Sequence, residues 1–255
     1  MKIGVVGCMG RVGSLLVTEI LSGNWDGVEL AGGTVLPGEE RETGYFVTSD
    51  AAKLFERADA VIDFTCPTAT LHHAALAAQH GKSLIVGTTG LSAEDEAQLR
   101  KAAEKTAIVY AANMSIGVNI LLALVEQAAA RLGEDWDIEI FEAHHKHKVD
   151  APSGTALAIG KAAAAGRNVD LETVADWARH GQTGARKKGD IGFAVARGGD
   201  VVGEHMATFY ADGERLQLGH VATNRALFAK GALRAALWTD GQKPGLYSMK
   251  DVLGL

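Results

Sequence analysis

The sequence has few of the residues on which secreted proteins and nucleic-acid-binding proteins depend. Its 255 residues include two cysteines, Cys8 and Cys66, which form no CxxC motif. Two cysteines cannot build a disulfide framework, so we expect a reducing compartment and two small buried thiols rather than a redox pair. The net charge is −6, from 25 basic and 31 acidic residues. This balance argues against a nucleic-acid partner, because such binders carry a basic surplus.

The sequence also lacks a targeting segment and a long apolar run. It begins with a short apolar stretch of strand length, not with a signal sequence. No uncharged apolar stretch reaches the roughly 20 residues of a membrane span. The nearest, Ile116 to Ala130, contains Asn119, Glu126 and Gln127, so we predict a buried helix there. We therefore expect a soluble, cytoplasmic protein without a membrane partner.

Proline is scarce and glycine abundant, with 4 and 31 residues, which favours tight turns over proline-rich linkers. The first part of the chain alternates apolar strand-length runs with helical periodicity. Such alternation is typical of βαβ crossovers and a parallel sheet. The predicted strands are Lys2–Val6, Val28–Ala31, Ala60–Phe64, Ser83–Val86 and Ala107–Tyr110, and the predicted helices are Val12–Leu21, Ser49–Arg57, Thr68–Gln79 and Ser92–Glu104.

The pattern changes after Asn113. We predict a helix over Gly117–Arg131, a strand over Asp137–Glu142 and a helix after Pro152. Three further strands, joined at Gly198-Gly199 and Asp212-Gly213, suggest an antiparallel meander, because such dipeptides are typical of hairpins. These strands are Ile191–Ala196, Val201–Tyr210 and Arg215–Val221. A last helix, Ala226–Trp238, returns to the first domain in this prediction.

Three glycines, Gly7, Gly10 and Gly13, lie between the first strand and the first helix in a GxxGxxG pattern. In a dinucleotide site, such glycines allow the tight turn, the approach of the pyrophosphate and close helix–strand packing. The alternative is a purely structural turn. The position favours the first reading and an α/β fold. We predict a Rossmann-type dinucleotide-binding domain (residues 1–113 and 225–255) and an α+β substrate-binding and oligomerisation domain with an open mixed sheet (residues 114–224).

One part of the dinucleotide pattern is missing. An acidic residue usually follows the second strand and holds the ribose 2′-hydroxyl. Here Val35 and Leu36 occupy that region, and the first acids are Glu39 and Glu40 in a loop. Arg11 could reach a 2′-phosphate, so we expect NADPH to be used at least as well as NADH. The sequence leaves the choice between NADPH and NADH open.

The most informative segment runs from Glu142 to Ala156. Within it, three histidines and two lysines occupy residues 144–148, in an acidic protein. Such a concentration of positive charge predicts a bound anion. The helix that opens at Pro152-Ser153-Gly154-Thr155 offers a second anion site, so we expect a small substrate with two acidic groups. A solvated basic face and a metal site are the alternatives, although lysines interrupt the histidines and no cysteine is near.

The segment Glu142–Thr155, EAHHKHKVDAPSGT, resembles the signature of the 4-hydroxy-tetrahydrodipicolinate reductase (dihydrodipicolinate reductase) family. The resemblance extends over nearly the whole chain, through GxxGRxG, Asp63-Phe64-Thr65, Gly87-Thr88-Thr89-Gly90, Ala111-Ala112-Asn113 and Gly203-Glu204-His205. It implies reduction of a cyclic imine dicarboxylate by NADPH or NADH, in lysine and diaminopimelate biosynthesis. It also implies a homotetramer formed through the sheet of the second domain.

The resemblance implies residue roles as well. His144 and Lys148 would be catalytic, and no residue would bind a metal. Residues implied to contact the substrate are His145, Lys148, Ser153, Gly154 and Thr155. Residues implied to contact the cofactor are Gly7, Cys8, Met9, Gly10, Arg11, Val12, Gly87, Thr88, Thr89, Ala111, Ala112, Asn113, Met114 and Arg225.

The sequence departs from the family where Val35 and Leu36 replace an acid and an arginine, and where Met114 replaces a frequent phenylalanine. Two other functions compete with this one: a different Rossmann-type oxidoreductase, such as an amino-acid dehydrogenase, and a nucleotide-binding module without catalysis. Turnover of the cyclic imine, of amino acids or of neither separates the three.

Overall fold

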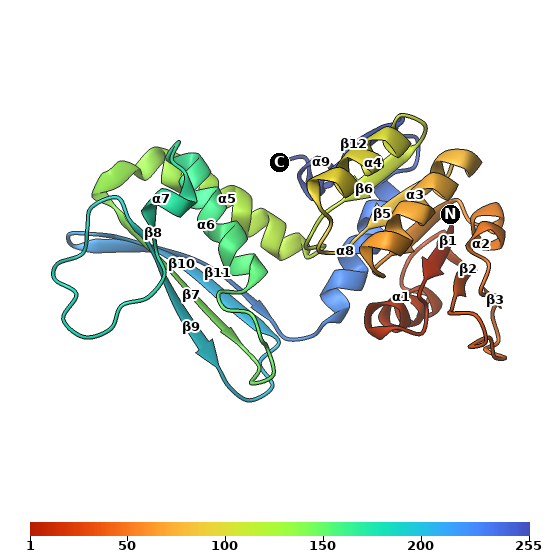
Figure 1. Cartoon of the computed structure of the whole chain (residues 1–255), viewed down its shortest axis with the longest axis horizontal. Helices are drawn as coiled ribbons and strands as arrows, with labels where there is room; N and C mark the ends of the chain where they lie inside the picture. Colours follow the sequence, from red (N-terminus) through yellow and green to blue (C-terminus); the bar gives the residue numbers. More distant parts are fainter. The chain divides into compact units, whose positions relative to one another are not determined.

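The computed structural model describes all of residues 1–255 (Figure 1). The chain forms two compact units. One consists of Met1–Ile116 together with Arg225–Leu255, and the other of Gly117–Asn224. The second unit is therefore an insertion into the sequence of the first.

The first unit is built on a seven-stranded sheet in which every pairing is parallel. Its strands are β1 (Lys2–Val6), β2 (Glu29–Thr34), β3 (Val47–Thr48), β4 (Ala60–Asp63), β5 (Ser83–Val86), β6 (Ala107–Tyr110) and β12 (Gly245–Tyr247). The strand order is β12-β6-β5-β4-β1-β2-β3. The order reverses between β4 and β1, and ligands of doubly wound sheets bind at the carboxyl ends of strands beside such a point.

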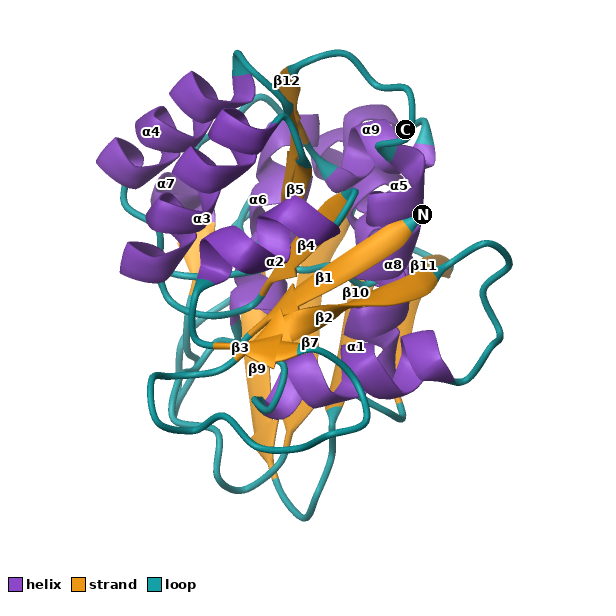
Figure 2. Ribbon diagram, turned by 90° about the vertical axis from the view of Figure 1, so that its right-hand side faces the viewer, coloured by secondary structure: helices purple, strands orange, loops and turns teal.

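Helices cover both faces of this sheet (Figure 2). On one face lie α1 (Arg11–Leu21), α8 (Ala226–Trp238) and α9 (Met249–Leu253), and on the other α2 (Ala51–Arg57), α3 (Pro67–His80) and α4 (Ala93–Ala103). Successive strand residues face opposite sides, so both faces must be apolar. In β5, Ile85 packs into the core on the α1 side, while Leu84 and Val86 pack on the α3 side.

Local signals in the sequence place several helix ends. Gly81 ends α3 in the left-handed conformation, at φ +63°. Ser92 and Asp95 form a capping box at the start of α4. The parallel Rossmann-type sheet is thus confirmed. Two strands of this sheet were missed, β3 and β12, because two or three residues are too few for a periodic pattern to show.

The second unit has a five-stranded mixed sheet, with order β11-β10-β7-β9-β8. The strands are β7 (Asp137–His144), β8 (Ala175–Asp176), β9 (Ile191–Arg197), β10 (Gly203–Ala211) and β11 (Glu214–Ala222). The helices α5 (Ile116–Leu132), α6 (Gly154–Gly166) and α7 (Leu171–Val174) supply apolar side chains to the core of this unit. Figure 1 shows α5 and α6 on the same face of the sheet.

The predicted meander is wrong in one of its two connections. Asp212-Gly213 does form a two-residue hairpin, with Ala211 paired to Glu214. However, β7 lies between β9 and β10, parallel to the first and antiparallel to the second. The loop at Gly198-Gly199 instead crosses the end of β7, where the Gly198 N–H donates to the His144 carbonyl at 2.9 Å. A local dipeptide cannot show that a strand from far earlier in the chain inserts between its neighbours.

The stretch Ile116–Asp135, which contains α5, is long and apolar enough to cross a membrane by length and composition. Its interior includes Glu126, and Leu121, Val125 and Ala129 pack into the core of the second unit. One side of α5 thus packs on the core, while Ile120 and Leu124 are exposed, so the predicted buried helix is buried on one side only.

Candidate functional site

The glycine loop after β1 has the geometry of a phosphate-binding turn. Gly7 has φ +65°, in the left-handed region. A Cβ on Gly13 would lie 2.1 Å from the Gly7 carbonyl oxygen, so only glycine lets α1 pack this close. The Gly10 N–H donates to that same carbonyl at 2.9 Å. The first amides of α1 have no partner within the helix, and with the helix dipole they suit a pyrophosphate.

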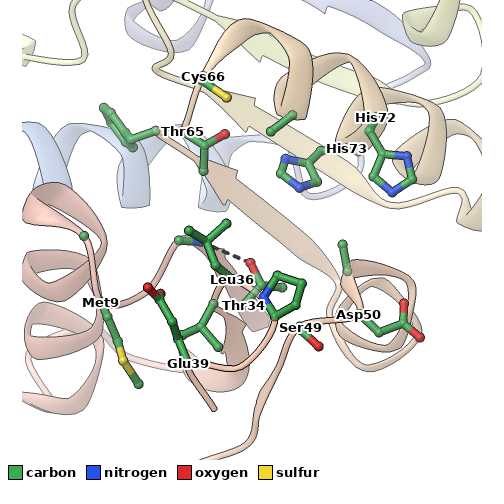
Figure 3. Close-up of a pocket in the computed structure, with 17 residues that line it drawn as sticks. Met9, Thr34, Leu36, Glu39, Ser49, Asp50, Thr65, Cys66, His72 and His73 are labelled. Atoms are coloured by element: carbon green, nitrogen blue, oxygen red, sulfur yellow. Dashed lines mark hydrogen bonds between the residues drawn. The ribbon is translucent and has the colours of Figure 1, made fainter. Parts of the chain in front are cut away.

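A pocket of about 620 Å³ lies beside this loop, at the carboxyl ends of β1, β2 and β4 (Figure 3). Ligand pockets commonly have volumes of about 300–1,000 Å³. Its walls are formed by Gly7, Met9, Gly10, Thr34, Val35, Leu36, Pro37, Glu39, Ser49, Asp50, Ala51, Phe64, Thr65, Cys66, Ala69, His72 and His73. The fold thus supplies a cavity where a dinucleotide's phosphates and adjoining groups would fit.

The two cysteines have different environments. Cys8 is 1% exposed, and its N–H donates to the Thr34 carbonyl at 2.9 Å. Burial raises the pKa of the Cys8 thiol. Cys66 is exposed and lines the pocket, so the prediction of two buried thiols is wrong for it. It is the N-cap residue of α3, in the short loop between the end of β4 and this helix.

Thr88, which follows β5, is a buried hydrogen-bonding centre. Its hydroxyl accepts from the Thr70 hydroxyl at 2.9 Å and from the Thr65 N–H at 3.1 Å, and donates to Asp63 at 3.3 Å. Asp63 also pairs with His73 at 2.8 Å. Burial opposes ionisation of Asp63, but hydrogen bonds from His73 and Thr65 outweigh it and lower the pKa of this carboxyl. The Thr88 side chain therefore holds the ends of β4 and β5 together.

The remaining residues that the resemblance assigns to the cofactor do not line this pocket. Gly87 and Thr89 follow β5, and residues 111–114 follow the neighbouring strand β6. Met114 is fully buried, and Arg225 caps α8. Arg11 and Val12 open α1 without contributing to the wall. The structure thus brings Gly7, Met9 and Gly10 together in one cavity and places the others at the same edge of the sheet.

In the second unit, strand register gathers the polar residues at the end of β7. Glu142 and His144 are two residues apart, so they face the same side of the sheet. Glu142 pairs with His205 in β10, and His144 pairs with Arg197 in β9. This side is the one that α6 covers, because Ile138 and Ile140 on it join the core with Ala156 and Ile159.

The Glu142 carboxylate, 1% exposed, is the centre of this group. One oxygen accepts from His144 Nδ1 at 2.6 Å and from Arg197 Nη1 at 2.8 Å. The other accepts from the Ser153 N–H and from Arg197 Nη2, both at 2.9 Å. Burial opposes ionisation of Glu142, but the hydrogen bonds from Arg197 and His144 outweigh it, so the pKa of this carboxyl is lowered.

These contacts fix the orientation of the His144 ring. With Nδ1 facing the carboxylate, Nε2 is the nitrogen left for a ligand. A Cβ on Gly203 would lie 3.0 Å from Nε2, so the glycine leaves room for the ring. The His205 ring packs edge-on at 5.1 Å between ring centres, and its Nε2 lies 3.0 Å from the Ser153 hydroxyl. Burial, aided by His144, lowers the pKa of His205 to about 4, so His205 is neutral at pH 7.

The end of α6 adjoins this group through Ser153. The Ser153 hydroxyl caps the helix by accepting from the Ala156 N–H at 3.2 Å. A Cβ on Gly154 would meet nothing within 4 Å, so open space adjoins the first residue of the helix. Lys148 Nζ contacts Asp150 at 2.8 Å, and this ammonium lowers the pKa of the Asp150 carboxyl. An imidazole, an ammonium and a helix N-terminus thus occur together, a set that can bind carboxylates and supply a proton.

Three residues of this group were not predicted: Glu142, Arg197 and His205. The spacing of Glu142 and His144 in a strand was a usable signal for the first. His205 lies in a stretch that carries the resemblance, Gly203-Glu204-His205, but no role was assigned to it. Nothing local identifies Arg197, because its pairing depends on the unexpected position of β7 between β9 and β10. No group of three or more His, Cys, Asp or Glu side chains has the arrangement of a metal site.

Comparisons with known proteins identify the family of the chain. Residues 1–114 match the family model "Dihydrodipicolinate reductase, N-terminus", and residues 117–253 match "Dihydrodipicolinate reductase, C-terminus". A 4-hydroxy-tetrahydrodipicolinate reductase of Ruegeria pomeroyi is 53% identical, over 98% of this chain and 97% of that protein. One of Parvibaculum lavamentivorans is 52% identical, over 100% and 98%.

Solved structures share the fold. A dipicolinate-bound dihydrodipicolinate reductase from Paenisporosarcina sp. TG-14 has a TM-score of 0.81 at 22% identity, covering 97% of both chains. An aspartate dehydrogenase from Thermotoga maritima has a TM-score of 0.51 at 10% identity, over 92% of this chain and 94% of that one. At such low identity, these likenesses support the two-unit architecture only. The matched models and the curated relatives decide the identity: the chain belongs to the dihydrodipicolinate reductase family.

Proposed function

We propose that this chain reduces 4-hydroxy-tetrahydrodipicolinate, through its dehydrated form, to tetrahydrodipicolinate with NADPH or NADH. One observation carries the proposal. In a member of this family, the buried Glu142 carboxylate joins the His144 imidazole to the N-terminus of α6. A proton donor and an anion-binding helix end are thereby held as one rigid group, as reduction of a dicarboxylate imine requires.

The cofactor would lie on the first unit, with its pyrophosphate at the glycine loop. The fit rests on the positive φ of Gly7 and on the close packing that Gly13 permits. A bound NADPH or NADH supplies the hydride. The residues proposed to hold it are Gly7, Cys8, Met9, Gly10, Arg11, Val12, Gly87, Thr88, Thr89, Ala111, Ala112, Asn113, Met114 and Arg225. For Cys8 and Thr88 the structure favours backbone contacts, because both side chains are buried.

The second unit would bind the ring and supply the proton. Gly154, Thr155 and Ser153 at the start of α6 hold one carboxylate, and His145 and Lys148 contribute further polar contacts. The ring contains a C=N bond conjugated with a C=C bond. Hydride adds to the far carbon of the C=C bond, the electron pair shifts toward nitrogen, and His144 Nε2 protonates the adjacent carbon. The C=N bond is retained, the cofactor is oxidised by two electrons, and the imidazole regains its proton from solvent.

The test is oxidation of NADPH and NADH with enzymatically generated substrate. Turnover of the cyclic imine, without turnover of amino acids, supports the proposed reaction. Reduction of NADP⁺ or NAD⁺ by amino acids, without turnover of the cyclic imine, would make the chain a different dehydrogenase. Binding of cofactor without either reaction would make it a binding module.

Cys66 reports on the pocket independently of activity. We expect Cys66 to react with iodoacetamide in the folded protein, and Cys8 only after unfolding, because Cys66 is exposed and Cys8 is buried. Saturating cofactor should slow the alkylation of Cys66, which lines the pocket wall. Mass spectrometry of tryptic peptides gives both rates. An alkylation rate unaffected by cofactor would place the cofactor away from this pocket.

We also propose that the chain forms a homotetramer through the sheet of the second unit. The side of that sheet away from α6 carries Phe141 and Tyr210, which are 44% and 40% exposed. Met206 pairs with Phe141 and Tyr210 pairs with Asp137, while Glu139 lies between the two pairs on the same side. This surface therefore combines exposed aromatic side chains with carboxylates, and aromatic side chains are enriched where subunits meet. Sedimentation equilibrium is expected to give four times the mass of one chain, and a monomer mass at micromolar concentration would contradict this.

A further inference from the structure

The wall of the pocket at the end of β2 lacks the usual acid. After Thr34 the chain continues with Val35, which is buried, and Leu36, which lines the pocket. In dinucleotide-binding domains, an acidic residue near this point accepts a hydrogen bond from the ribose 2′-hydroxyl. That hydroxyl distinguishes the two cofactors, because in NADPH it carries a phosphate.

A tight turn brings a different carboxylate to the same wall. The Glu39 N–H donates to the Leu36 carbonyl at 3.0 Å, and Gly38 has φ +85°. With Pro37 second and Gly38 third, this sequence suits a type II turn. The turn reverses the chain just beyond β2, so that Glu39 lines the pocket with Gly7 and Gly10. Figure 3 shows its carboxylate pointing into the cavity, between Met9 and Leu36.

The neighbouring carboxylates are already engaged. Glu40 accepts a hydrogen bond from the Gly38 N–H at 2.9 Å, and a further one from Ser49 lowers the pKa of its carboxyl. Asp50 caps α2 by accepting from the Ala52 N–H at 3.0 Å. No hydrogen bond or ion pair holds the Glu39 side chain. It is therefore the acid in this wall that is available to a ligand.

The wall contains no lysine or arginine, and Arg11 is not part of it. A phosphate monoester carries about −1.5 to −2 charges at pH 7. In this pocket it would face the carboxylates of Glu39 and Asp50. The wall has no guanidinium or ammonium to compensate, and of its two imidazoles, His72 and His73, the second is paired with Asp63. A hydroxyl, in contrast, can donate a hydrogen bond to a carboxylate.

We infer that Glu39 accepts the ribose 2′-hydroxyl of the dinucleotide and makes NADH the preferred cofactor of this chain. The inference rests on the proposed cofactor site. From the missing acid after β2, we expected NADPH to be used at least as well as NADH. The turn at Pro37-Gly38 reverses this expectation, because it brings the Glu39 carboxylate to the pocket from beyond the strand end.

Isothermal titration calorimetry of both cofactors, without substrate, tests the inference. We expect wild type to bind NADH at least about tenfold more tightly than NADPH, from charge repulsion that added salt screens. Glu39→Gln should lower this ratio at least about fivefold, and the matched control Glu40→Gln should leave it within about twofold. Leu36→Arg should strengthen NADPH binding, because it adds a cation to the wall.

The outcomes separate the two proposals. Binding of neither cofactor would overturn the cofactor site itself, and the preference with it. Equal binding of both by wild type, or an unchanged ratio in Glu39→Gln, would overturn the role of Glu39 and leave the site intact. Glu39 is exposed, so its substitution is expected to leave the melting temperature unchanged. The Leu36→Arg variant provides an independent measurement in the opposite direction.

Discussion

Replacing His144 by alanine is expected to lower kcat by at least about tenfold, and by up to the roughly 10²–10⁴-fold that a general acid contributes. The Glu142 carboxylate holds Nδ1 at 2.6 Å, so the ring presents Nε2 in a fixed orientation. In the variant without the His144 imidazole, water must protonate the negatively charged substrate ring. Steady-state NADH or NADPH oxidation with saturating substrate measures the effect.

Lys148→Ala should also lower kcat by at least about tenfold, because it removes a cation that stabilises the developing negative charge. The dissociation constant for cofactor, which binds to the other unit in our proposal, should change by less than about twofold in both variants. His147→Ala is the matched control, since His147 is exposed in the same segment and has no assigned role. Near-normal turnover in both His144→Ala and Lys148→Ala would remove the catalytic assignment.

Glu142→Gln is expected to lower kcat by on the order of 10–10²-fold while leaving cofactor binding unchanged. The four donors around Glu142 are His144 Nδ1, the Ser153 N–H and two nitrogens of Arg197. Glutamine offers one oxygen and an NH₂ group, so at least one donor must face another donor. The His144 ring would lose its fixed orientation, and Glu142 thus acts as a positioning residue.

The conservative variant Glu142→Asp distinguishes positioning from a general loss of structure. Aspartate keeps the charge and both accepting oxygens, so Glu142→Asp should retain more of the wild-type kcat than Glu142→Gln does. The melting temperature and the dissociation constant for cofactor should be the same in the two variants. Glu204→Gln is the control, since Glu204 is exposed on the same sheet. An equal loss of kcat in Glu142→Asp and Glu142→Gln would show that the carboxylate does not act through His144.

Much of the first unit could be predicted because its information is local. Buried parallel strands are short apolar runs, and helix ends at Gly81 and Ser92 are encoded by capping residues beside them. The second sheet was harder, because β7 pairs with strands more than 45 residues away in the chain. Hairpin signals describe neighbours in sequence and carry no information about an inserted strand.

The candidate site shows the same division. His144, Lys148 and Gly154 lie within one segment, and a compact motif can reveal them. Glu39 was noted only as a loop residue, because its approach to the pocket depends on a turn. Arg197 and His205 reach Glu142 and Ser153 only through strand register. Residues that act through pairing between distant segments are invisible to a motif.

The insertion of the second unit between Ile116 and Arg225 affects the order in which the protein forms during translation. The strand β12 and the helices α8 and α9, which complete the first unit, come from Arg225–Leu255, which is synthesised after the inserted unit. Apolar side chains of β1 and β5 therefore lack their partners Leu233 and Met249 until the whole inserted unit has been synthesised. The inserted unit emerges from the ribosome earlier and can fold first. A nascent chain stalled before Arg225 thus exposes the apolar surface of the first unit that α8 and α9 would cover. We expect chaperones to bind such a chain.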